Sequence, residues 1–133
     1  MMRSDISQKN KYWIPKHRYY ELKHFCLQYS DWVNSLVYLG ELTSNGEQIK
    51  VADSKISDQT GNVAVKRLYF RNKMKLVEDA ANCVEESLSK FILIAVTTGR
   101  SYDYMALHYT IPCGRDLWYE NYRKFFYILN CSQ

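Results

Sequence analysis

Apolar residues recur every three or four positions along most of the chain, the pattern of amphipathic helices. In the N-terminal part this stripe comprises Tyr19, Leu22, Cys26 and Tyr29. Pro15 precedes it and suits the first turn of a helix, where its missing N–H is not needed. Ser30 can cap a second helix over residues 31–39 that ends at Gly40. The pattern predicts a basic arm and a helical hairpin within residues 1–40.

A polar stretch follows the predicted hairpin. Residues 41–59 contain the turn signal Asn45-Gly46 and only scattered apolar residues, so we expect a connector there. Asp58 can cap the next helix, because its carboxylate can accept a backbone N–H of the first turn. The apolar face of that helix comprises Val63, Phe70, Met74, Val77, Ala81 and Val84. The sequence therefore predicts a second, helical domain over residues 60–133.

The C-terminal part of this domain has the sequence layout of a helix-turn-helix. A break at Asn82-Cys83 precedes a predicted buried helix that stops at Gly99. Ser101 can cap a short helix that runs to about Tyr109, and the segment Ile111-Pro112-Cys113-Gly114 interrupts it. A last helix is predicted from Arg115 to about Asn130. The expected fold is all-α and ends in a helix-turn-helix.

The last helix divides into two faces. Its core side comprises Trp118, Tyr122, Phe125 and Leu129. Arg115, Tyr119 and Arg123 lie four apart on another side, as a DNA-recognition helix requires. Arg115 is the candidate for base readout, because its guanidinium can bond guanine through two hydrogen bonds, while Tyr119 and Arg123 would contact phosphates. A plain amphipathic helix with a polar outer face is the alternative.

Further basic residues could contact a DNA backbone. Arg67, Arg71 and Lys75 lie four apart on the helix that follows the connector, Arg100 precedes the helix-turn-helix, and Lys124 lies on its last helix. A solvated helix face explains Arg67, Arg71 and Lys75 equally well. The net charge of +4 and the isoelectric point near 8.8 are compatible with nucleic acid and do not identify it.

Composition narrows the class of protein. The 47% hydrophobic content can supply a core, which excludes a disordered chain. No apolar run approaches the roughly 20 residues that span a bilayer, so we expect no membrane segment. The polar start of the chain does not have the pattern of a signal peptide, which favours the cytoplasm.

The chain carries no pattern of a metal or catalytic site. Its four cysteines are isolated from one another, and its three histidines do not pair with them at the short spacings of zinc ligands. Glycine-rich phosphate loops and nucleophile elbows are absent from the sequence. We expect no metal, no cofactor and no enzymatic activity.

Two sets of residues resemble known proteins. The stretch from Gly114 to Tyr119, followed by Arg123, resembles the recognition helix of small phage regulators of the ArpU and RinA type, which are similar to the fourth region of sigma factors. The chain as a whole resembles proteins of Firmicutes phages and prophages, through residues 12–22, 58–61 and 111–116.

The resemblance implies a transcriptional regulator of phage genes, late genes in particular, that binds double-stranded DNA in the cytoplasm of a bacterial host. Host RNA polymerase or another host protein would be a further partner, and a homodimer would fit an operator with two half-sites. Two alternatives remain open. One is a small phage inhibitor that binds a host nuclease or defence component through an aromatic surface. The other is a DNA-packaging protein that resembles the small terminase subunit.

Overall fold

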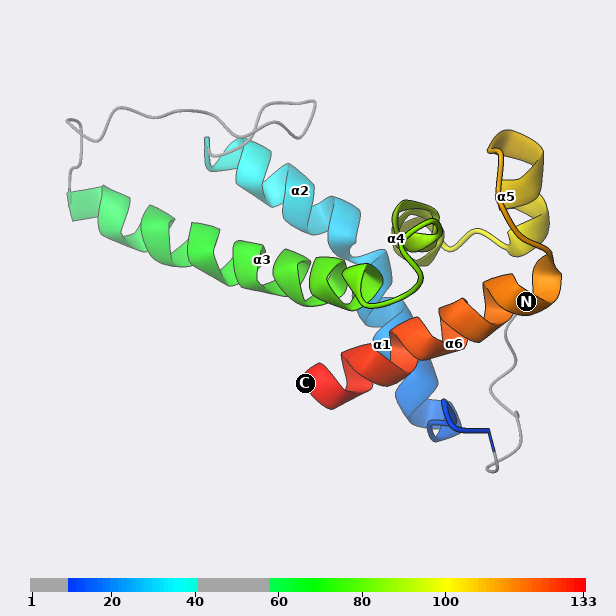
Figure 1. Cartoon of the computed structure of the whole chain (residues 1–133). Helices are drawn as coiled ribbons and strands as arrows, with labels where there is room; N and C mark the ends of the chain where they lie inside the picture. Colours follow the sequence, from blue (N-terminus) through cyan, green and yellow to red (C-terminus); the bar gives the residue numbers. More distant parts are fainter. Residues whose placement is uncertain (1–9, 41–57) are drawn as a thin grey trace. The chain divides into compact units, whose positions relative to one another are not determined.

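The computed structural model describes residues 10–40 and 58–133, with side chains from Asn62 onward in the second range. These residues form helices α1 (Lys16–Leu27), α2 (Tyr29–Tyr38), α3 (Asp58–Asn82), α4 (Ser89–Thr98), α5 (Tyr102–His108) and α6 (Arg115–Ser132) (Figure 1). No strand occurs among them, so the prediction of an all-α fold is confirmed. The predicted connector lies outside the described residues except for its last two positions. None of the described helices could cross a membrane.

The helices group into two compact units. One unit comprises α1 and the chain from Leu76 to Gln133, and the other comprises α2 and α3 up to Lys75. This grouping differs from the predicted division into residues 1–40 and 60–133. The physical reason is that α1 packs against α4 and α6. Its apolar stripe is therefore buried by helices from the far end of the chain.

The predicted helical hairpin is not confirmed. Only Gln28 separates α1 from α2, and its backbone angles, φ −79° and ψ −4°, are themselves helical. A helical hairpin needs a loop of two to five residues, which the chain does not have here. Ser30 does not cap α2, since the helix already begins at Tyr29.

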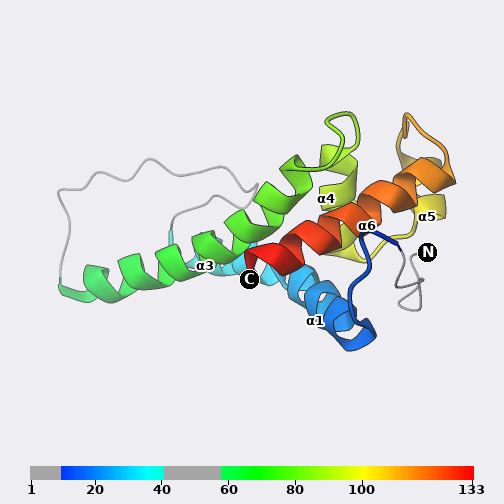
Figure 2. The same ribbon diagram turned by 60° about the horizontal axis from the view of Figure 1, so that its bottom comes forward.

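Helix α6 forms the centre of the first unit. It buries the predicted core side and three further residues; the full set is Trp118, Tyr119, Asn121, Tyr122, Phe125, Phe126 and Leu129. Helix α1 crosses α6, as Figure 2 shows, and the ring of Tyr19 meets that of Phe126 edge-on at 5.2 Å. Arg18 of α1 fixes the end of α6, because its Nε donates to Asn130 Oδ1 at 2.7 Å.

A buried amide joins α6 to the loop between α3 and α4. Asn121 is only 5% exposed, and its Oδ1 accepts the backbone N–H of Glu85 at 3.1 Å. Its Nδ2 donates to the carbonyl of Leu117 at 3.0 Å. Both ends of the amide therefore have partners, which offsets the free energy needed to bury it.

The predicted helix ends at Gly99 and Ser101 are confirmed. Gly99 has φ 73° and follows α4 directly. A Cβ at this position would be strained, and it would also lie 3.2 Å from Cδ2 of Leu27. Two residues later, the hydroxyl of Ser101 accepts the backbone N–H of Tyr104 at 3.3 Å and begins α5.

In the second unit α2 and α3 run in opposite directions. Nε of Arg67 donates to the carbonyl of Leu39 at 3.1 Å, while Nζ of Lys73 lies 5.9 Å from the ring centroid of Trp32. The contact at Leu39 satisfies a carbonyl that the end of α2 leaves without an intrahelical donor. Gly40, at φ 79°, then ends the helix as predicted.

Burial predicts how stability depends on pH. Burial raises the pKa of the Cys26 thiol to about 12 and also raises the pKa values of Tyr19 and Tyr122. The folded state therefore holds these protons more tightly than the unfolded state, so the stabilisation is complete below pH 9 and is lost as the pH rises above it. Urea midpoints should fall steadily above pH 9, and less steeply in Cys26→Ala than in the exposed-site control Cys131→Ala. A urea midpoint of the unchanged protein that stays constant above pH 9 would contradict the burial of Cys26, Tyr19 and Tyr122.

Candidate functional site

Helices α5 and α6 share a buried joint across the turn that connects them. Met105 of α5 and Trp118 of α6 are both inaccessible to solvent. The ring of Tyr102, at the start of α5, lies 5.8 Å from that of Trp118. Helix α4 packs against both, so three helices enclose one small core. The short helix, the turn and the longer helix thus form one module, named here the α5–α6 module.

Tyr102 fixes the shape of the turn. Its hydroxyl donates to the carbonyl of Cys113 at 2.9 Å, and its backbone N–H donates to the hydroxyl of Tyr119 at 3.3 Å. These bonds join the beginning of α5 to both the end of the turn and the first turns of α6. Sequence reasoning missed Tyr102; the only signal was an aromatic residue directly after the helix cap.

Loss of the Tyr102 hydroxyl should loosen the turn. Tyr102→Phe leaves the Cys113 carbonyl without this donor, and we expect the free energy of unfolding to fall by about 1 kcal/mol. Tyr104→Phe is the matched control, because the ring stack of Tyr104 with His108 on the same helix is preserved. Chemical denaturation measures both variants. Equal stability of the two would show that the hydroxyl does not hold the turn.

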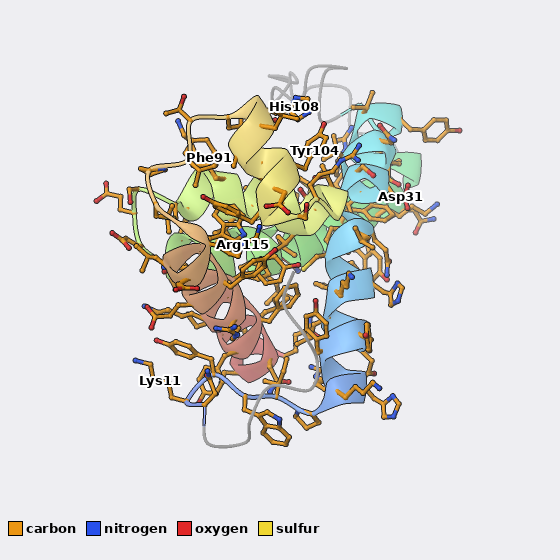
Figure 3. All side chains as sticks on the ribbon, turned by 90° about the vertical axis from the view of Figure 1, so that its right-hand side faces the viewer. Lys11, Asp31, Phe91, Tyr104, His108 and Arg115 are labelled. Atoms are coloured by element: carbon orange, nitrogen blue, oxygen red, sulfur yellow. The ribbon has the colours of Figure 1, made fainter. Side chains whose placement is uncertain are left out.

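Arg115 stands at the beginning of α6 and is held from two sides. Its guanidinium forms an ion pair with the carboxylate of Asp103 on α5. It also lies 5.5 Å from the ring centroid of Tyr102. The Arg115 side chain remains 52% exposed, so the fork is oriented by its neighbours and still accessible (Figure 3). The open N-terminus of α6 lies beside it, since a Cβ at Gly114 would meet no atom within 4 Å.

A second exposed cation, Arg100, lies directly before α5. The guanidinium of Arg100 stacks over the ring of Tyr104 at 4.4 Å, and that ring lies 4.1 Å from the ring of His108. Figure 3 shows Tyr104 and His108 on the same side of α5. Sequence reasoning found Arg100 and missed the two rings that support it. The spacing of four between Arg100, Tyr104 and His108 was the available signal.

Three predicted contacts on α6 occupy less accessible positions. Tyr119 is only 7% exposed and its hydroxyl is used by Tyr102, so the prediction that it faces outward to contact phosphate is wrong. The reason is that α1, α4 and α5 all contact α6, which buries more than one face. Arg123 and Lys124 are half-buried. The Nε of Arg123 is buried and has no hydrogen-bond partner within the described part of the chain.

The predicted contacts on α3 belong to the other unit. Arg67 is engaged by the carbonyl of Leu39, so its predicted role as a phosphate contact is replaced by a structural one. Arg71 and Lys75 also have partners within the fold. The α5–α6 module therefore retains Arg115 and Arg100 as its exposed predicted cations.

Acidic side chains lie close to the exposed cations. Asp116 and Glu120 are exposed on the first two turns of α6, in addition to Asp103 on α5. Each would repel a phosphate and reduce binding that depends on charge alone.

The described residues hold no site for a metal. No group of three potential ligands comes together within residues 10–40 and 58–133. Burial, with a smaller contribution from the Glu85 carboxylate, raises the pKa of the Cys113 thiol beside α6. The thiol is therefore protonated at neutral pH and is a poor nucleophile.

No protein family, curated protein or solved structure matches the chain.

Proposed function

We propose that the protein binds duplex DNA through the α5–α6 module and acts as a regulator of phage transcription. The observation that carries the proposal is the joint between the two helices. Met105 and Trp118 are fully buried there, while Gly114 and Arg115 at the start of α6 stay exposed. Rigid packing behind an accessible helix start is the geometry that a recognition helix needs. The resemblance of residues 114–119 to phage regulators supports the same proposal.

In this mode the start of α6 enters the major groove. The guanidinium of Arg115, already oriented by Asp103 and Tyr102, then donates two hydrogen bonds to a guanine. An exposed ion pair contributes only about 0–1 kcal/mol, so Arg115 can exchange Asp103 for a base at little cost. Arg100, directly before α5, contacts the phosphate backbone.

The acidic residues of α6 should moderate this binding. Glu120→Gln removes a charge that repels phosphate, and we expect affinity for all duplexes to rise several-fold at low salt. Glu21→Gln, an exposed change on α1, is the matched control and should have no such effect. Fluorescence anisotropy with labelled duplexes measures both. Equal affinities for unchanged protein and Glu120→Gln would place the DNA away from this face of α6.

The proposal is tested by offering the purified chain fragments of the genome that encodes it, across a salt series. Selective retention of one or a few fragments, weakening as salt increases, is the expected result. Binding to none of the fragments, even at low salt, would refute the proposal.

A further inference from the structure

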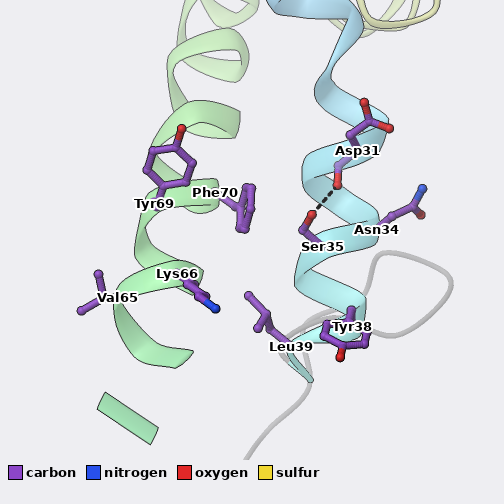
Figure 4. Close-up of a pocket in the computed structure, with 9 residues that line it drawn as sticks. All are labelled: Asp31, Asn34, Ser35, Tyr38, Leu39, Val65, Lys66, Tyr69 and Phe70. Carbon is purple, nitrogen blue, oxygen red and sulfur yellow. Dashed lines mark hydrogen bonds between the residues drawn. The ribbon is translucent and has the colours of Figure 1, made fainter. Parts of the chain in front are cut away.

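The second unit carries an apolar hollow between its two helices. The hollow has a volume of about 770 Å³ and lies between α2 and α3 (Figure 4). Its walls include Leu39, directly after α2, and Phe70 from α3. Tyr38 and Tyr69 stand at its edge, one on each helix. The hollow is thus built entirely within one compact unit.

Apolar side chains around the hollow are unusually exposed. Tyr38 is 90% and Leu68 is 61% exposed, and more than half of Val65 and Tyr69 is accessible as well. Together these four side chains expose roughly 500 Å² of surface. The largest apolar patch of a monomeric protein usually covers about 300–600 Å², so this surface lies in the upper part of that range. We name this surface the α2–α3 patch, defined by Tyr38, Val65 and Tyr69, which line the hollow, and by Leu68, three positions after Val65 on α3. A patch of this size marks an interaction site.

We propose that the α2–α3 patch pairs with the same patch of a second copy of this chain, in a two-fold symmetric dimer. Such a pairing would remove about 1,000 Å² from water, which reaches the lower limit of specific interfaces. Two antiparallel helices from each copy would then form a four-helix arrangement around one shared core. The exposed Tyr38 of each copy would enter the hollow of the other.

The charged residues at the rims of the hollow allow it to pair with a second copy of itself. The two rims of the hollow carry opposite charges, Asp31 on α2 and Lys66 on α3. A two-fold interface must be self-complementary, because each residue of the patch meets the patch itself. An acid on one helix and a base on the other satisfy this condition when α2 of one copy lies against α3 of the other.

Salt separates this association from DNA binding. The described part of the second unit has five basic residues (Lys66, Arg67, Arg71, Lys73 and Lys75) against the acids Asp31 and Asp58. Two such units repel each other at long range, and salt screens that repulsion. Dimerisation should therefore be unchanged or stronger at high salt, whereas DNA binding weakens.

Sedimentation velocity of the full chain over a concentration series, without DNA, tests the proposal. The unchanged protein should reach the mass of a dimer, and Tyr38→Glu and Leu68→Glu should each weaken association about tenfold or more, since a charge would be buried in the interface. Leu107→Glu, at an 81% exposed position on α5, is the matched control and should remain dimeric. Circular dichroism verifies that each variant keeps its helical content.

A charge swap tests the pairing itself. Asp31→Lys should weaken the dimer, and the double change Asp31→Lys with Lys66→Asp should restore it, because the opposite charges then meet again with their places exchanged. A protein that stays monomeric at the highest concentration would overturn the proposal. So would a dimer that tolerates both Tyr38→Glu and Leu68→Glu. These results are independent of whether the chain binds DNA.

Discussion

Trp118→Ala is expected to lower the free energy of unfolding by about 3–5 kcal/mol, the range for removing a large buried aromatic side chain. Trp118 is completely buried at the joint of the α5–α6 module, where its ring lies 5.8 Å from that of Tyr102. The cavity left by alanine cannot close easily, because α4 and α5 both pack on α6. Urea unfolding followed by circular dichroism measures the effect.

Leu107→Ala is the matched control for this change. Leu107 belongs to the same module and is 81% exposed, so its loss should alter stability by no more than about 0.5 kcal/mol. A Trp118→Ala variant as stable as this control would contradict the packing of α5 on α6. Without that packing, the start of α6 would not be held in a defined orientation.

Arg115→Ala is expected to weaken binding to the preferred duplex by about 10- to 100-fold, corresponding to the 1–3 kcal/mol of a bidentate contact with guanine. Affinity for nonspecific duplexes should fall much less, because the variant loses only one cation that could contact a phosphate. Fluorescence anisotropy with the preferred duplex and with a scrambled one measures the two affinities.

Two further variants separate hydrogen bonding from charge. Arg115→Lys keeps the charge and loses the planar fork, so it should bind nearly as weakly as Arg115→Ala. Lys90→Ala removes an exposed cation of the same unit and should affect the two duplexes equally. Full affinity in Arg115→Lys would show that Arg115 contributes only its charge.

Local signals predicted much of the helical layout. Gly40 and Gly99 have positive φ and end their helices, as glycine after an apolar stripe indicates. Ser101 caps α5 because its hydroxyl oxygen accepts the backbone N–H of Tyr104, three positions later. The spacing of apolar residues located the core side of α6, from Trp118 to Leu129. Each of these features depends on residues that are close together in the sequence.

Features that depend on distant contacts could not be predicted in this way. A spacing of four placed Tyr119 on the face of Arg115, yet packing by three other helices buries Tyr119. Arg67 has the spacing of a solvated cation, and its role comes from the carbonyl of Leu39 on another helix. The partner of the Asn121 amide, the N–H of Glu85, is 36 positions away.

The two compact units differ from the predicted domains for the same reason. A polar stretch marks a domain boundary when helices that are adjacent in the sequence also pack on each other. Here α1 packs on α4 and α6, and the backbone of Gln28, between α1 and α2, is itself helical. Sequence periodicity shows which face of α1 is buried and does not show which helix buries it.

Backbone amide chemical shifts measured during titration with the preferred duplex would show whether the α5–α6 module contacts DNA. The largest shift changes should fall at Ser101–Asp103 and Gly114–Leu117, and Arg115→Ala should need about 10- to 100-fold more duplex to reach them. Changes confined to other helices, with these two segments unmoved at saturation, would contradict the proposed contact.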